Sequence, residues 1–143
     1  MDDLDRSILG FLGADARVSV ATLARRLKVA RSTIQARLER LETSGVIAGY
    51  TVKLSEGARQ SRIRATVLLT IEPRAQANIL TRLKAIAEVE RIHTTSGRVD
   101  FLLQVAAPST TVLDGVLDQI GEMTGVKSSE SLIHLSTKLD RAV

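Results

Sequence analysis

A short amphipathic segment, RSTIQARLERLETSG at residues 31–45, carries three arginines and several small polar side chains. Ile34, Leu38 and Leu41 recur at intervals of four and three residues, which predicts a helix with one narrow buried stripe. The side chains around that stripe are of the types that bind phosphates and base edges, so we weigh DNA contact against a solvated charged surface. The predicted DNA-binding residues are Arg25, Arg31, Ser32, Thr33, Gln35, Arg37 and Arg40.

Positive charge is concentrated around this segment. Between Arg25 and Arg40 the chain has six basic residues and one acidic residue, a net charge of +5, whereas all 143 residues together carry +4. The remainder is therefore about neutral. A local basic patch of this kind is typical of proteins that bind nucleic acid. Arg31, Ser32, Gln35 and Arg40 are predicted to face the groove, and which of them touches a base stays open.

The elements before and after the basic segment indicate how it is positioned. Apolar spacing predicts helices over 2–13 and 20–27, the second capped by Ser19, and residues 28–30 form a tight connection. Gly45 ends the basic helix, and a short β-prone stretch follows at 46–52. Two helices joined by a tight turn and followed by a β-ribbon predict a winged helix-turn-helix over residues 1–52.

The second half of the chain follows another pattern. Residues 53–63 are polar and read as a linker, and residues 64–143 read as one domain. Alternating and helical spacings predict its elements in the order strand 64–71, helix 75–87, strand 88–95, strand 99–106, a helix around 113–120 ended by Gly125, and strand 127–139. This is the ferredoxin-like βαββαβ order of an α+β domain. Its open sheet face, with Leu68 and Leu102, predicts a homodimer.

Several classes of function are not supported by the sequence. There is no cysteine, and His93 and His134 each stand alone in a predicted strand, so we expect no metal and no cofactor. No catalytic constellation is visible, so we do not expect an enzyme. No apolar run approaches the ~18 residues of a membrane span, and the acidic start is unlike a signal peptide. We therefore expect a soluble cytoplasmic protein.

The run Ser32-Thr33-Ile34-x-x-Arg37-Leu38-x-Arg40-Leu41-Glu42-x-x-Gly45-Val46-Ile47 resembles the N-terminal half of the Lrp/AsnC (feast/famine) transcriptional regulators. The stretch Ser96-Gly97-Arg98-Val99-Asp100-Phe101 is similar to that family's Gly-x-x-Asp loop. The resemblance implies a regulator that binds double-stranded DNA, dimerises through its C-terminal sheets and often assembles to octamers. It also implies a small-molecule effector, usually an amino acid, bound by the loop and the last strand at Gly97, Arg98, Val99, Asp100, Ser129 and Ser131.

Two departures from the family pattern leave alternatives open. Ala30 stands where relatives usually have a capping Ser or Thr, so Ser32 is a second candidate for the cap, which would start the helix two residues later. Arg98 replaces an acid common in relatives, so the effector is not named. On pattern alone the Gly97–Asp100 segment is an ordinary hairpin turn. The rival functions are a ligand-independent DNA-organising protein and an α+β module whose basic helix is incidental.

Overall fold

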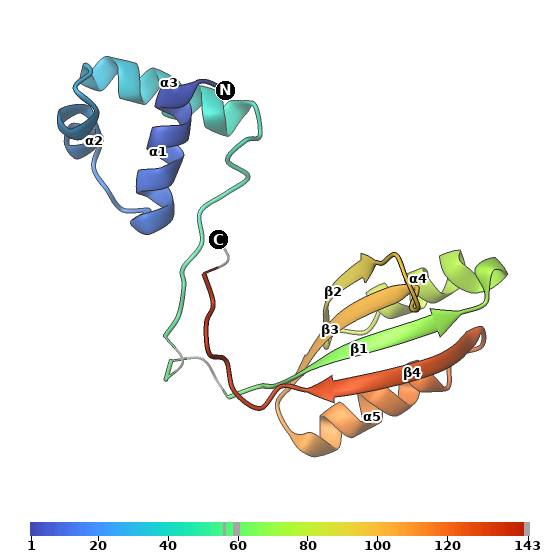
Figure 1. The fold of residues 1–143 in the computed structure, drawn as a ribbon. Helices are drawn as coiled ribbons and strands as arrows, with labels where there is room; N and C mark the ends of the chain where they lie inside the picture. The colour runs from blue at the N-terminus through green and yellow to red at the C-terminus, as the bar shows by residue number, and fades with distance from the viewer. Residues whose placement is uncertain (56, 59–60, 142–143) are drawn as a thin grey trace. The chain divides into compact units, whose positions relative to one another are not determined.

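The computed structural model describes residues 1–55, 57–58 and 61–141 of the chain. The chain divides into two compact units, one built on Met1–Lys53 and the other on Leu54–Asp140 (Figure 1). The exact domain boundaries expected at 52 and 64 stay a prediction.

The N-terminal unit is a bundle of three short helices, α1 (Asp3–Ala14), α2 (Val20–Leu27) and α3 (Arg31–Thr43). The Asp2 side chain accepts a hydrogen bond from the Asp5 backbone and begins α1, and Ser19 caps α2 as predicted. Lys28 takes a left-handed conformation, with φ of 57°, and so turns the chain sharply between α2 and α3. The helix-turn-helix is thus confirmed. Its core consists of Ile8, Leu23, Ala24, Ile34 and Leu41.

Two expectations for this unit are wrong. Ala30 itself occupies the extended N-cap position of α3, with no side-chain cap, and Ser32 lies inside the first turn, so the helix does not start two residues later. No described residue of 46–52 belongs to a strand, so the β-ribbon is absent. The Ile47 N–H donates to the Leu41 carbonyl, so this stretch is tied to the end of α3. None of the described residues of the unit forms a second strand with which it could pair.

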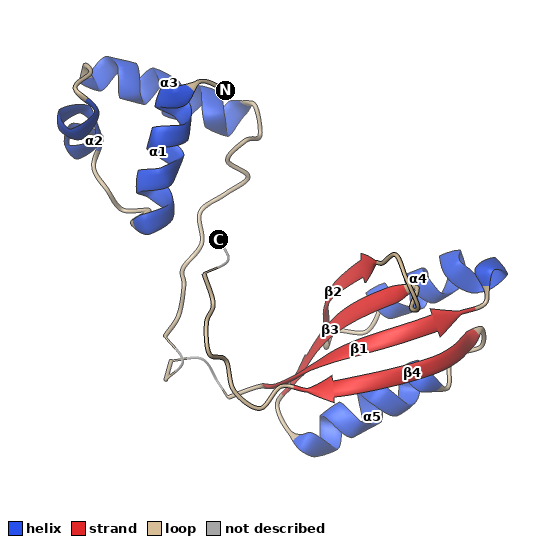
Figure 2. Cartoon of the chain, in the orientation of Figure 1, coloured by secondary structure: helices blue, strands red, loops and turns tan. Residues whose placement is uncertain are grey.

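The C-terminal unit is a four-stranded antiparallel sheet with two helices on one face (Figure 2). The strands lie in the order β2-β3-β1-β4, which confirms the ferredoxin-like βαββαβ domain. The elements are β1 (Ile63–Ile71), a 3-10 turn η1 (Pro73–Ala75), α4 (Gln76–Lys84), β2 (Val89–Thr94), β3 (Phe101–Ala107), α5 (Thr110–Gly121) and β4 (Val126–Ile133).

Alternation along the strands separates the two sheet faces. Val67 and Leu69 of β1 and Leu103 of β3 are buried under the helices. Leu68 and Leu102 are paired across β1 and β3 on the opposite face and are only half-buried. The predicted inward set Ala65, Val67, Leu69 and Ile71 is confirmed as core.

The ends of the later elements differ from the prediction. The α5 helix ends at Gly121 and not at Gly125, which instead takes a φ of +99° in the turn before β4. A side chain at Gly125 would collide with Ala75. Glycine at this position therefore allows the turn to pack against Ala75 and does not end the helix. The last strand ends at Ile133, six residues earlier than expected, and α4 ends at Lys84.

Candidate nucleic-acid interface and effector loop

The apolar stripe of α3 fixes which of its faces is exposed. Ile34 and Leu41 are buried and Leu38 is half-buried against the same core, so the stripe predicted for this helix is confirmed. Ser32 and Gln35 consequently lie on the exposed face, and Thr33 is half-buried. The helix therefore presents polar side chains outward while α1 and α2 hold its inner side, which is the arrangement that a groove-reading helix requires.

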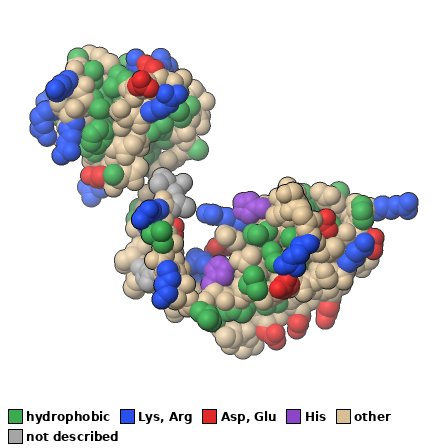
Figure 3. All heavy atoms as spheres, viewed as in Figure 1, with side chains coloured by type: hydrophobic (Ala, Val, Ile, Leu, Met, Phe, Trp, Pro, Cys, Tyr) green, Lys and Arg blue, Asp and Glu red, His purple; other side chains and the backbone are tan. Residues whose placement is uncertain are grey.

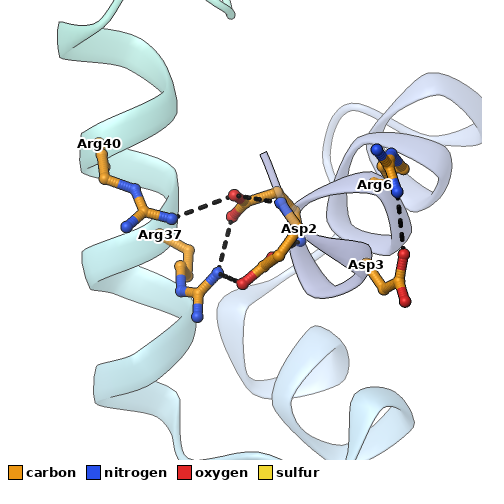
Figure 4. Close-up of polar contacts among 6 residues, drawn as sticks. Asp2, Asp3, Arg6, Arg37 and Arg40 are labelled. Carbon is orange, nitrogen blue, oxygen red and sulfur yellow. Dashed lines mark hydrogen bonds and ion pairs between the residues drawn. The ribbon is translucent and has the colours of Figure 1, made fainter.

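Two of the predicted DNA-binding arginines are held by two carboxylates at the start of α1, those of the N-cap residue Asp2 and of Asp5. Arg37 Nη1 donates to Asp2 Oδ2 and, at 3.2 Å, to Asp5 Oδ1 (Figure 4). Arg40 Nη2 donates to Asp5 Oδ2 at 3.1 Å. These contacts were not predicted from the sequence, because 32–35 residues separate the partners along the chain.

These contacts shift the proton affinity of the groups involved. The hydrogen bond from Arg37 holds the pKa of Asp2 down to about 2. Burial acts to raise the pKa of Asp5, but hydrogen bonds from Arg37 and the Asp2 backbone outweigh it, so the pKa is lowered. The hydrogen bonds to Asp2 and Asp5 raise the pKa of Arg37. Two carboxylates thus balance the charge of two α3 arginines.

Four further cations lie on α2, at the start of α3 and in the turn between these two helices. We call this surface the basic turn, and it consists of Arg25, Arg26, Lys28 and Arg31. All four are exposed, and in the described part of the chain none of them has a carboxylate partner. Arg26 lies over the Phe11 ring, 5.9 Å from its centroid. Figure 3 shows lysine and arginine side chains gathered at the α2 end of this unit.

The Gly97–Asp100 loop is fixed to the end of β1 by hydrogen bonds. The Asp100 N–H donates to the Leu69 carbonyl at 2.8 Å, and Asp100 Oδ2 accepts from the Ile71 N–H at 2.9 Å. The Thr95 hydroxyl donates to the Val99 carbonyl at 2.8 Å. Gly97 has a φ of +109°, which makes glycine the favoured residue in this turn. Asp100 therefore has a structural role whether or not it also binds a ligand.

The effector-binding residues predicted on β4 face the opposite side of the sheet from Glu130, the β4 residue that contacts Arg98. Ser129 and Ser131 pair with Leu69 and Val67 and so face the helix side of the sheet. Glu130 faces the open side, and its carboxylate lies 3.5 Å from Arg98. The structure therefore brings Arg98 to Glu130 rather than to the two serines. Sequence reasoning missed Glu130. It stands between the two serines on one strand, so its side chain had to face the opposite side of the sheet from theirs.

The histidine and acidic side chains are dispersed over the described part of the chain. Nowhere in it do three or more histidine, aspartate or glutamate side chains gather in a way that could hold a metal ion. His134 Nε2 lies 2.8 Å from the Thr66 hydroxyl. None of the described helices combines the length and apolarity that crossing a membrane requires.

Comparison with known proteins accounts for both units. A family model described as the AsnC-type helix-turn-helix domain matches residues 1–42, and one described as the Lrp/AsnC ligand binding domain matches residues 64–143. The chain belongs to the Lrp/AsnC family. It is a transcriptional regulator with a helix-turn-helix domain and a ligand-binding domain of this family.

Individual Lrp/AsnC proteins match over almost the whole chain. The HTH-type transcriptional regulator LrpA of Mycobacterium tuberculosis is 31% identical over 93% of this chain and 89% of its own length. The solved structure of E. coli AsnC is 27% identical, covers 100% of this chain and 97% of that one, and superimposes with a TM-score of 0.90. The crystal structure of the M. tuberculosis leucine response regulatory protein LrpA is 30% identical, covers 100% of this chain and 98% of that one, and superimposes with a TM-score of 0.79.

Proposed function

We propose that this Lrp/AsnC protein is a sequence-specific DNA-binding regulator whose oligomer responds to a small molecule, an amino acid in the first instance. One observation carries the DNA part of the proposal. The exposed cations of the basic turn have no carboxylate partners among the described residues, and they flank the exposed face of α3. Phosphates are the partners that such cations fit, and the neighbouring Ser32 and Gln35 fit base edges.

Salt-dependent DNA binding tests this proposal. The probe is the duplex that the full chain enriches from a random-sequence library, and fluorescence anisotropy measures its Kd from 50 to 300 mM salt. We expect log K to fall steeply with log salt, and each lost phosphate contact to reduce the slope by about 0.9. The variant Arg25→Ala/Arg31→Ala should weaken binding and flatten the slope.

A matched control removes charge elsewhere in the same unit. Arg6→Ala deletes an exposed arginine that Figure 4 shows on the side of α1 away from α3, paired with Asp3 at 3.0 Å. The Kd of this variant for the duplex and the slope of log K against log salt should change little. If the Arg25→Ala/Arg31→Ala variant binds like wild type, the basic turn is not the interface. An equal loss in both variants would leave only a general effect of net charge.

For the effector we propose a site at the Gly97–Asp100 loop. Arg98 and Glu130 offer exposed opposite charges 3.5 Å apart, which suit the carboxylate and ammonium of an amino acid. The model of the family's ligand-binding domain matches this half of the chain. A relative that is 30% identical to the whole chain is described as a leucine response regulatory protein. The side chains of Ser129 and Ser131 face away from this pair, so they are the weakest members of the proposed set.

Thermal shift with the twenty amino acids tests the site. A ligand at 100 times its Kd should stabilise the protein by about 2.7 kcal/mol and raise its melting temperature. The variant Arg98→Ala/Glu130→Ala should lose the shift, and Asp118→Ala, an exposed acid on α5, should keep it. A ligand whose shift survives in the Arg98/Glu130 variant binds elsewhere. DNA binding with relaxed sequence preference and no ligand shift would favour the alternative, a ligand-independent DNA-organising protein.

We further propose a homodimer through the open sheet face, assembling to an octamer. Leu68 and Leu102 lie side by side on a face that no helix of the unit covers, and a second copy would bury them. Figure 3 shows apolar side chains on this face between the two histidines. In sedimentation experiments, Leu68→Glu should shift the assembly toward monomer. Val112→Glu changes an exposed apolar residue on α5 and should not, and equal sedimentation of both variants would exclude this face.

A further inference from the structure

Asp5 is unusual because it is a charged residue whose side chain is almost completely shielded from solvent. Its side chain is 2% exposed, and among the described residues it is the one charged or polar residue classed as buried. An ionised carboxylate is costly to bury unless it is paired and hydrogen-bonded. An apolar side chain such as leucine or methionine would avoid the cost of burying a charge, so stability alone does not explain the carboxylate at this position.

The contacts of Asp5 join α1 to two successive turns of α3. Its Oδ1 accepts from Arg37 at 3.2 Å and its Oδ2 from Arg40 at 3.1 Å. The two arginines are three residues apart on α3, so they lie one above the other on a single face. A rotation or slide of α3 along α1 would break at least one of these contacts, which apolar packing alone would not penalise so sharply.

The two arginines differ in how free they are. The Arg37 side chain is 25% exposed and is shared between Asp2 and Asp5, whereas the Arg40 side chain is 60% exposed and, among the described residues, forms an ion pair with Asp5. Arg37 is thus enclosed by carboxylates on its own unit. Its guanidinium is poorly placed to act as a phosphate ligand.

We propose that Asp5 is a positioning residue for DNA recognition: through Arg37 it sets the place of α3 on α1, and thereby the reach of the exposed α3 side chains into the groove. Arg37 then acts within the fold rather than on a phosphate. This inference rests on the proposed sequence-specific binding of DNA. The competing account is that Asp2 and Asp5 only reduce the positive potential of the unit, in which case their loss would strengthen binding to any DNA.

The decisive comparison is between Asp5→Asn and Asp3→Asn in the full chain. Both remove one negative charge from the first turn of α1, but Asp3 is 99% exposed and, among the described residues, pairs with Arg6. Binding is measured to the selected duplex and to a scrambled duplex of the same composition. We expect Asp5→Asn to reduce the preference for the selected duplex roughly tenfold, about the worth of one base contact. Asp3→Asn should leave the preference unchanged.

A second variant keeps the test valid if Asp5→Asn fails to fold. Arg37→Gln should also lower the preference for the selected duplex but leave the salt slope of binding unchanged, because no phosphate contact is lost. The double variant Asp5→Asn/Arg37→Gln should lose less than the sum of the two single effects, since both single variants remove the Arg37–Asp5 contact. Methyl signals of Ile34 and Leu41 measure the fraction folded in each sample.

Three outcomes overturn the inference. The first is an equal effect of Asp5→Asn and Asp3→Asn on the preference for the selected duplex. The second is tighter binding of Asp5→Asn to both duplexes by the same factor. The third is a salt slope that falls by about one in Arg37→Gln, which would make Arg37 a phosphate ligand. If the wild-type chain enriches no duplex at all, sequence-specific binding itself fails, which is a separate result.

Discussion

The two units fix their candidate functional residues by different means. In the N-terminal unit, α3 is held by ion pairs between side chains that are more than 30 residues apart, from Asp2 and Asp5 to Arg37 and Arg40. In the C-terminal unit, each hydrogen bond that holds the Gly97–Asp100 loop has an uncharged backbone group of Leu69, Ile71 or Val99 as one partner, and the Asp100 carboxylate accepts one of these bonds. Ion pairs are screened by salt, whereas hydrogen bonds with an uncharged partner are screened less. The position of α3 should therefore be the adjustable one.

The largest effect is expected from removing the buried carboxylate. Asp5→Ala leaves Arg37 and Arg40 without their shared acceptor and should lower the melting temperature of the N-terminal unit by roughly 10 °C or more. Asp3→Ala breaks only an exposed pair and should shift it by about 2 °C or less. Methyl NMR of Ile34 and Leu103 during heating follows the two units separately. Equal shifts for both variants would mean that the buried contacts do not hold the unit together.

The matching change in the C-terminal unit concerns Asp100. Asp100→Ala deprives the partly buried Ile71 N–H of its acceptor and should cost about 1–3 kcal/mol in urea unfolding of that unit. Asp100→Asn keeps an acceptor oxygen and should cost less. The signals of Ile34 should be unaffected in both. A loss confined to ligand binding, with no change in stability, would contradict the structural role of this carboxylate.

The sequence predicted faces far better than it predicted contacts. Strand alternation placed Val67 and Leu69 in the core correctly, because a period of two leaves only two choices. The partners of Arg37 were not predictable, since they depend on how α1 crosses α3. The missing β-ribbon shows the same limit: the β-prone residues 46–52 have no strand in their unit to pair with.

The candidate site was predicted in part for the same reason. The exposure of Arg31, Ser32 and Gln35 follows from helical period and core position. The orientation of Ser129 and Ser131 depends on the register of β4 against β1, which one sequence does not specify. A shift of one residue would have turned both serines to the open face.

A smaller effect, in pH, would sharpen the comparison between the units. The pKa of Asp2 is lowered to about 2 by Arg37, so its pairing stabilises the folded state fully above its ordinary pKa of 3.8. That stabilisation is lost as the pH falls from about 4 to 2, because the unfolded chain then binds more protons. The stability difference between wild type and Arg37→Gln should shrink across this window in NMR-detected unfolding. A difference that stays constant down to pH 2 would show that the pair does not form.

The smallest effect concerns the start of α3. Ala30 holds the extended backbone of an N-cap, with φ of −68° and ψ of 150°, but offers no side-chain acceptor. Ala30→Ser supplies a hydroxyl at that position and should stabilise the N-terminal unit by about 0.5–1 kcal/mol in urea unfolding. Ser19→Ala should cost a similar amount, because the Ser19 hydroxyl accepts from the Thr22 N–H at 3.0 Å.

Ser32→Ala separates the two possible starts of α3. Ser32 lies inside the first turn rather than at the cap, so this change should leave stability within about 0.5 kcal/mol of wild type. A loss as large as that of Ser19→Ala would mean that the helix begins at Ser32 in solution. Arg31 would then belong to the turn rather than to the helix, and the residue that leads α3 toward DNA would change with it.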